Sequence, residues 1–151
     1  MIILSKLADY GVIVATHLAA VAPNQANAMH VAADTRLPQT TVAKVLKLLA
    51  KAGIVSAVRG AAGGYRLARH ADEISVAEIV AAIDGDFAMT QCTSKIGPCD
   101  RLHYCPTRPH WHRINRAVGD ALAGVTLGEM VLPSLAAPSF SPEYNIETTA
   151  P

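Results

Sequence analysis

The segment between residues 28 and 67 constrains the fold more than any other part of the chain. A short helix is expected at residues 28–35, and Pro38 then suits the first position of a second helix, which does not need the amide hydrogen that proline lacks. The second helix should run over residues 39–52 and end at Gly53, which readily takes a left-handed conformation. Its spacing predicts an apolar stripe that faces a core, made of Val42, Val45, Leu46 and Leu49.

A β-hairpin is expected directly after this pair of helices. Residues 54–58 favour one strand, a glycine-rich turn follows, and residues 65–67 favour the return strand. Arg59 and Arg66 flank the turn with positive charge. A further helix should then begin at the capping box of residues 75–78. The turn holds three glycines that permit positive φ angles and a close approach of backbones, namely Gly60, Gly63 and Gly64.

This order of elements predicts a mainly α fold with a small β wing, that is, a winged helix-turn-helix domain. In such a domain the second helix places hydrogen-bonding side chains in the major groove of DNA, and an arginine at the wing tip can enter the minor groove. The expected partner is therefore double-stranded DNA. The predicted DNA-binding residues are Gln39, Thr40, Thr41, Lys44, Arg59, Gly60, Gly63, Gly64, Tyr65 and Arg66.

The distribution of charge agrees with this expectation. Residues 1–70 carry eight Lys and Arg against two Asp, whereas the rest of the chain carries five Lys and Arg against ten Asp and Glu. A basic head on an acidic body is typical of a phosphate-binding module, because only the head gains from counterion release on DNA. Charge alone would fit a solvated basic face equally well. The order of elements favours DNA.

The chain of 151 residues is long enough for one modest core with an appendage. Its longest apolar stretch, residues 11–22, is interrupted by Thr16 and His17 and is shorter than the roughly 20 residues of a membrane-spanning helix. Asp9 and His17 also argue against a cleaved signal peptide. The apolar spacing instead predicts an amphipathic helix of a folded domain. We expect a cytoplasmic protein with no membrane partner.

Three cysteines, Cys92, Cys99 and Cys105, lie within a segment that lacks helical or strand periodicity. Soft thiolates gathered in this way suit an iron-sulfur cluster or zinc, and an odd number cannot pair completely into internal disulfides. Zinc is the weaker alternative, because no close C-x2-C pair is present. A metal-free thiol redox switch is a further alternative. A fourth ligand must come from outside these three cysteines.

A helix over residues 109–125 should carry a narrow apolar seam formed by Trp111, Ile114, Val118, Leu122 and Val125. A seam beyond the core of a small domain most simply pairs with its copy in a second subunit, so we predict a homodimer with this long dimerisation helix. Packing of the seam on its own head is the alternative. The expected domains are a DNA-binding head (1–85), a cysteine loop (86–106), a dimerisation helix region (107–132) and a proline-rich disordered tail (133–151).

Four features together resemble the Rrf-type winged-helix regulators. These are residues 4–11, the wing at residues 58–67, three cysteines before Trp111, and residues 125–127. The resemblance covers nearly all of residues 1–132, and the combination of wing and cysteines is specific. The family includes the Isc-type and Suf-type regulators of iron-sulfur assembly and the nitric-oxide-sensing NsrR type. The residues from Trp111 onward look closest to the Suf-type regulators of proteobacteria.

The resemblance implies a homodimeric repressor that controls iron-sulfur assembly genes and is not an enzyme. Its three cysteines would bind an iron-sulfur cluster of the 2Fe-2S or 4Fe-4S type, and cluster occupancy would change the affinity for a palindromic operator. A repressor that senses nitric oxide or redox state is the alternative. The chain also shows no paired carboxylates, activated nucleophile or nucleotide fingerprint that would indicate catalysis.

The resemblance leaves the fourth cluster ligand open. Isc-type members use a histidine three residues after the last cysteine, where this chain has Arg108, a side chain that stays protonated. NsrR-type members use an aspartate near the start of the first helix, supplied across the dimer, and Asp9 matches that position. Asp9 is therefore the first candidate. His103, between two of the cysteines, is the second, and His110 and His112 follow the cysteines.

Overall fold

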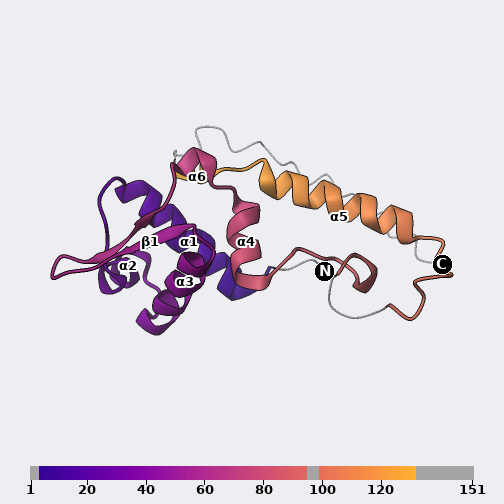
Figure 1. The fold of residues 1–151 in the computed structure, drawn as a ribbon, viewed down its shortest axis with the longest axis horizontal. Coiled ribbons are helices and arrows are strands. Elements are labelled where there is room, and N and C mark those ends of the chain that lie inside the picture. The colour runs from indigo at the N-terminus through magenta and orange to yellow at the C-terminus, as the bar shows by residue number, and fades with distance from the viewer. Residues whose placement is uncertain (1–3, 95–98, 132–151) are drawn as a thin grey trace, which may run out of the picture.

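The computed structural model describes residues 4–94 and 99–131, and these residues form a mainly helical fold with one two-stranded antiparallel sheet (Figure 1). The predicted fold class is confirmed. The elements are α1 (Lys6–Val21), α2 (Ala28–Thr35), α3 (Gln39–Lys51), β1 (Val55–Val58), β2 (Gly64–Leu67), the 3-10 turn η1 (Ala71–Glu73), α4 (Val76–Asp84), the 3-10 turn η2 (Gln91–Thr93), α5 (Arg108–Ala123) and α6 (Leu127–Val131).

The helices of the head begin where their capping residues lie. The Ser5 hydroxyl accepts a hydrogen bond from the Ala8 amide at 3.0 Å and starts α1. At α4 the predicted capping box is complete: the Ser75 amide donates to Glu78 Oε2 at 2.9 Å, and the Glu78 amide donates to Ser75 Oγ at 3.3 Å. Both starts depend on side chains within three positions of the helix end.

The start of α3 differs slightly from the expectation. Pro38 lies just before the helix, as its N-cap, rather than at the first helical position. Its carbonyl oxygen accepts hydrogen bonds from the amides of Thr41 and Val42, each at 3.0 Å. The amide hydrogen that proline lacks is not needed here, because the first amides of a helix have no partner within it. At the other end Gly53 has a φ of 74°, the left-handed conformation that was predicted.

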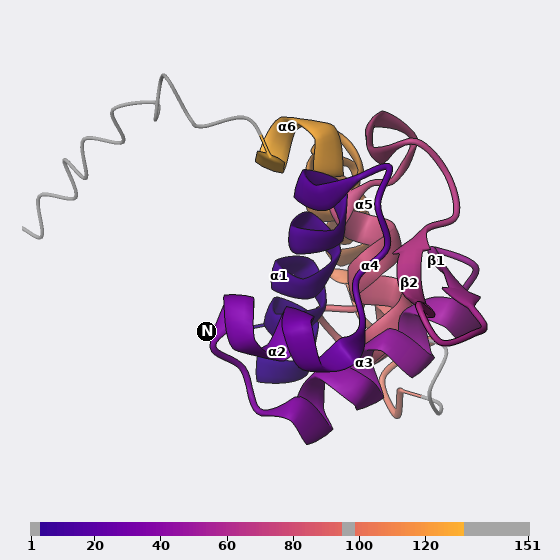
Figure 2. The same cartoon turned by 90° about the vertical axis from the view of Figure 1, so that its left-hand side faces the viewer.

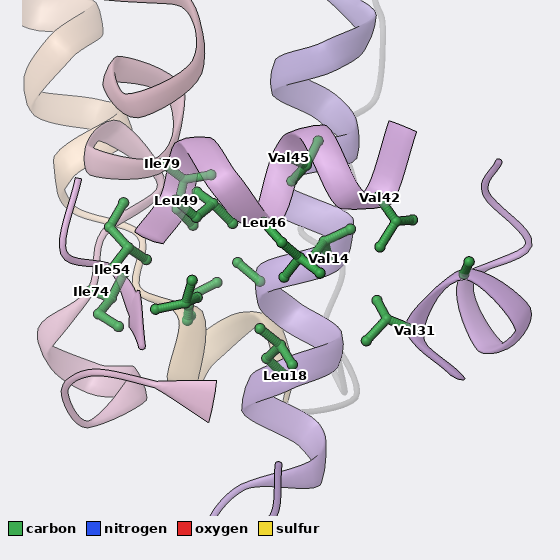
Figure 3. Close-up of a cluster of buried hydrophobic side chains, with 14 residues drawn as sticks. Val14, Leu18, Val31, Val42, Val45, Leu46, Leu49, Ile54, Ile74 and Ile79 are labelled. Atoms are coloured by element: carbon green, nitrogen blue, oxygen red, sulfur yellow. The ribbon is translucent and has the colours of Figure 1, made fainter. Parts of the chain in front are cut away.

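One hydrophobic core holds the head together, and α1 and α3 cross within it (Figure 3). The predicted stripe of α3 is completely buried, because Val42, Val45, Leu46 and Leu49 each have no exposed surface. Ile54 before β1 and Ile79 of α4 close the same cluster. The sequence did not indicate that Leu127, at the start of α6, would also be fully buried in this core.

The elements of the head pack together, whereas α5 extends away from them. Figure 1 shows α5 reaching away from the head, while Figure 2 shows α1, α2 and α3 gathered with α4 and the wing. Among the described residues, the main contacts of α5 are with α4 and η2, and no residue of α5 is buried. After α5 the chain returns, and α6 packs on α1 and η1.

No helix in the described part of the chain has the length and apolar character needed to cross a membrane. The tail expected at residues 133–151 lies outside the described residues.

Candidate nucleic-acid interface and cysteine arm

The turn between α2 and α3 presents the start of α3 to the surface. Arg36 adopts a left-handed conformation with a φ of 56°, and the Leu37 amide donates to the Ala32 carbonyl at 3.1 Å. This closes α2 and turns the chain within three residues. Of the predicted contacts at the start of α3, Gln39, Thr40 and Lys44 are exposed and Thr41 is half-buried.

The exposed polar face of α3 extends beyond the predicted contact residues, which end at Lys44. Lys47 and Lys51 are exposed and follow Thr40 and Lys44 at steps of three and four residues. Residues at these steps lie on one face of a helix. The signal that could have identified them was present in the sequence, since the same spacing that defined the apolar stripe also defines this opposite face.

The glycines of the wing have two different roles. Gly60 has a φ of 118°, which only glycine adopts readily, so it makes the tip turn. Gly63 and Gly64 have no such φ, but a Cβ atom on them would lie 2.5 Å from the Val58 carbonyl oxygen and 2.7 Å from the Ala26 carbonyl oxygen, respectively. Glycine is required at both positions because the neighbouring backbone leaves no room for a Cβ atom.

The wing is tied to the loop between α1 and α2. The Ala26 amide donates to the Tyr65 carbonyl at 3.0 Å, and the Tyr65 amide donates to the Ala26 carbonyl at 2.8 Å. Gln25 Nε2 also donates to the carbonyl of Ala62 at the tip. The Tyr65 side chain is half-buried against the core and supports the wing from below. The wing is therefore hydrogen-bonded to the α1–α2 loop at β2 and again at the tip turn, which fixes its position on the head.

The arginines near the wing are not equivalent. Arg59 and Arg66 are exposed. Arg69 instead donates to Glu78 Oε1 at 2.6 Å and to the Glu73 carbonyl at 3.0 Å. Its charge is thus paired within the head. Arg69, one of the eight Lys and Arg residues of positions 1–70, therefore stabilises the head rather than offering a free charge to DNA.

The three cysteines lie on the arm that leads from α4 to α5, and all are free and half-buried. Cys92 lies in η2, with its sulfur 3.2 Å from Thr90 Oγ1. The sulfur of Cys105 lies 3.3 Å from Thr107 Oγ1. Hydrogen bonds from the hydroxyl and the backbone of Thr107 lower the pKa of the Cys105 thiol, which favours the thiolate that binds metals.

The single chain does not bring the proposed cluster ligands together. Within residues 4–94 and 99–131, no group of three or more His, Cys, Asp or Glu is close enough to hold a metal ion. Asp9 is exposed in the first turn of α1, on the head, and His103 is exposed on the arm. The donor chemistry nevertheless fits a soft metal site, because the arm carries three reduced thiols.

The predicted seam of α5 is only partly covered. Ile114 is 42% exposed, and Trp111, Val118 and Leu122 are half-buried. Val125 was predicted to belong to the seam, but α5 ends at Ala123. Val125 lies after the helix, and its carbonyl oxygen accepts from the Val76 amide at 2.9 Å. Packing of the seam on its own head, the alternative considered from the sequence, therefore does not bury it in the described residues.

Comparisons with known proteins agree with the fold and the wing. The chain matches the model of the Rrf2 family, described as an iron-dependent transcriptional regulator, over residues 4–133. It is similar to the HTH-type transcriptional regulator IscR of Vibrio campbellii, with 39% identity over 83 residues that cover 55% of the chain and 49% of the regulator. The chain thus matches about half the length of this curated relative.

Two solved structures are also similar. CymR, the global cysteine regulator of B. subtilis, aligns with a TM-score of 0.70 at 26% identity, covering 87% of this chain and 97% of CymR. IscR of T. potens aligns with a TM-score of 0.66 at 25% identity, covering 86% of each chain.

Proposed function

The chain belongs to the Rrf2 family of transcriptional regulators, and on this premise we propose that it is a homodimeric repressor whose three cysteines hold an iron-sulfur cluster. Cluster occupancy sets its affinity for a palindromic operator, and its targets include iron-sulfur assembly genes. The relatives are regulators and not enzymes. The observation that carries the cluster proposal is the set of three free, half-buried thiols on the arm that joins the head to α5.

DNA contact divides between α3 and the wing. The exposed row on α3 enters the major groove, where Gln39 and Thr40 reach base edges and Lys44 contacts phosphate. Arg59, beside the wing tip, enters the adjacent minor groove. Because the wing is hydrogen-bonded to the α1–α2 loop, its tip keeps a defined position relative to α3.

The partly exposed seam of α5 pairs with the same seam of a second subunit. A two-fold dimer places two copies of α3 on successive half-sites, which is why the operator is expected to be palindromic. In such a dimer, Asp9 of the partner subunit is the first candidate for the fourth ligand. His103, exposed on the arm itself, is the second candidate.

A thiolate-bound iron-sulfur cluster, when present, is a group that oxidants, nitric oxide or iron shortage can remove or alter. The protein then needs only a modest coupling between arm and head, since about 1–3 kcal/mol changes DNA affinity roughly 5- to 150-fold. Cys92, Cys99 and Cys105 supply the thiolates. The arm is continuous with α4 and α5, so a change in its shape reaches both the head and the dimer helix.

Anaerobic purification followed by iron and sulfide analysis, visible and Mössbauer spectra, and operator binding with and without cluster tests the proposal. We expect the wild-type protein to bind iron and sulfide. We also expect its operator affinity to change at least about fivefold between the cluster-loaded and cluster-free forms, which is within the range of ordinary allosteric coupling. The triple Cys→Ser variant should fold, bind no iron, and show one affinity under both conditions. Absence of iron and sulfide from the wild-type protein, together with unchanged binding, would overturn the proposal.

A metal-free thiol switch is the second candidate, and the lowered pKa of Cys105 favours it. Its mark is an operator affinity that still responds to thiol oxidants after all iron has been removed, and that loses this response in Cys105→Ser.

A further inference from the structure

One side chain of α5 holds the first part of the cysteine arm. The Asn115 side chain accepts a hydrogen bond from the Met89 amide at its Oδ1, at 2.9 Å, and donates from Nδ2 to the Phe87 carbonyl at 3.2 Å. These partners lie 26 and 28 positions away in the sequence. A carboxamide carries both a donor and an acceptor, so this one side chain satisfies two backbone groups of a segment that belongs to no helix or strand.

The clamp lies three residues before the first cysteine, and a compact turn joins them. The Thr90 amide donates to Thr93 Oγ1 at 3.2 Å, and the Thr93 and Ser94 amides donate to the Thr90 carbonyl at 3.0 and 3.1 Å. Cys92 lies inside this turn, with its sulfur against the Thr90 hydroxyl. Met89 precedes Thr90 directly, so one peptide bond and the hydrogen bonds of this turn connect the clamp to the Cys92 sulfur.

A second tie holds the root of the arm to the head. At the end of α4, Asp84 Oδ1 accepts from Ser5 Oγ at 2.6 Å and Asp84 Oδ2 accepts from the Ser5 amide at 3.4 Å. Ser5 is the N-cap of α1, the helix that carries Asp9 in its first turn. The segment between Asp84 and Cys92 is thus attached at one end to the head and at the other to α5.

We propose that Asn115 is a positioning residue that holds the Cys92 segment against α5, so that Cys92 is a preplaced ligand for the cluster. The inference deepens the proposed function and rests on it for the cluster. The clamp uses only atoms of Asn115, Phe87 and Met89, so it can be measured in protein prepared without a cluster. Loss of the clamp frees Cys92 from α5 while the head, whose core contains no α5 residue, keeps its fold.

The test uses the full chain with Asn115→Ala, and with Asn115→Asp, which keeps the acceptor for Met89 but loses the donor to Phe87. Arg116→Ala is the matched control, because Arg116 is the exposed neighbour on the same helix. In cluster-free protein we measure hydrogen exchange at the Met89 amide and the alkylation rate of Cys92 relative to Cys105. In anaerobically loaded protein we measure the visible spectrum and the rate of cluster loss.

For Asn115→Ala we expect Met89 exchange and Cys92 alkylation to rise about 3- to 10-fold, as loss of one or two hydrogen bonds predicts, with Cys105 unchanged. Cluster loss should accelerate by a similar factor, Asn115→Asp should fall between the two, and Arg116→Ala should match wild type. If Asn115→Ala leaves Cys92 alkylation at the wild-type rate, the inference is wrong, whatever the cluster does. If wild-type protein binds no cluster but Cys92 still responds to Asn115→Ala, the positioning role stands and the proposed function fails.

Discussion

Glu78 caps the start of α4 and also pairs with Arg69. Its carboxylate accepts from the Ser75 amide, which lowers its pKa most, and the Arg69 guanidinium lowers the pKa further. Burial acts in the opposite direction. A carboxyl whose pKa is lower in the folded than in the unfolded state stabilises the fold at pH values above its ordinary value of 4.5, and this stabilisation is lost as the pH falls through the folded pKa.

We therefore predict that Glu78→Gln, which keeps an oxygen that can accept from the Ser75 amide but removes the charge paired with Arg69, lowers the free energy of unfolding by about 0.5–1 kcal/mol at pH 7, the usual range for a partly exposed ion pair at a helix start. The difference from wild type should shrink as the pH falls below 4.5. Thermal unfolding at a series of pH values measures this difference. Glu73→Gln, an exposed neighbour that makes the same change of charge, is the control and should show a much smaller effect. Equal losses for both variants at every pH would contradict the assignment.

At the same scale, the glycines show how far residue-level reasoning reaches. The glycine-rich pattern predicts that Gly60, Gly63 and Gly64 all serve a tight wing tip. The structure separates a positive φ at Gly60 from steric contact at the other two. The first need is set by the local turn. The contact of Gly64 with Ala26 depends on a loop 38 positions earlier, which no local pattern indicates.

At the scale of elements, α3 and the wing form the proposed DNA-binding surface, and the structure changes its membership. Lys47 and Lys51 join the row that begins with Thr40 and Lys44. Arg69 is not counted among the charges that can contact DNA, because it is paired with Glu78. The sequence shows charge and period for each element, but it does not show which basic side chain meets a carboxylate of another element.

This distinction predicts different salt dependence for two arginines close to each other in sequence. Arg59→Ala should weaken operator binding and reduce the slope of log K against log salt by about 1, because one phosphate-neutralising charge is lost. Arg69→Ala should leave that slope unchanged and lower the thermal stability instead. Fluorescence anisotropy at several salt concentrations, together with thermal unfolding, measures both quantities. An unchanged slope for Arg59→Ala would refute the wing contact.

At the scale of the whole molecule, α5 reaches away from the head and α6 returns to it (Figure 1). The return is anchored by Leu127, which is fully buried, and by the Leu127 amide, which donates to the Ile74 carbonyl at 2.9 Å. The Val76 amide likewise donates to the Val125 carbonyl at 2.9 Å. The segment that follows α5 is therefore fixed to the head by a buried side chain and two backbone hydrogen bonds.

We predict that Ile114→Glu shifts the proposed dimer strongly toward monomer, because an unpaired charge at a desolvated seam costs several kcal/mol. Operator binding should weaken with it, since a monomer contacts one half-site. Sedimentation equilibrium measures the association. Ala123→Glu adds the same charge near the end of α5 on the opposite face and serves as the control. A dimer of unchanged stability in Ile114→Glu would show that the seam is not the interface.

The sequence alone determined the order of the elements, the core stripe of α3, the glycine turn of the wing and the presence of three thiols on one segment. These features are encoded by caps, periodicities and turn residues that act within about four positions, so they can be read before the chain folds. Only the tertiary structure decided that Leu127 completes the core, that Arg69 is paired and that Asn115 holds the arm beside Cys92. Each of these contacts joins side chains to residues on other elements, and it forms only once packing brings those elements together.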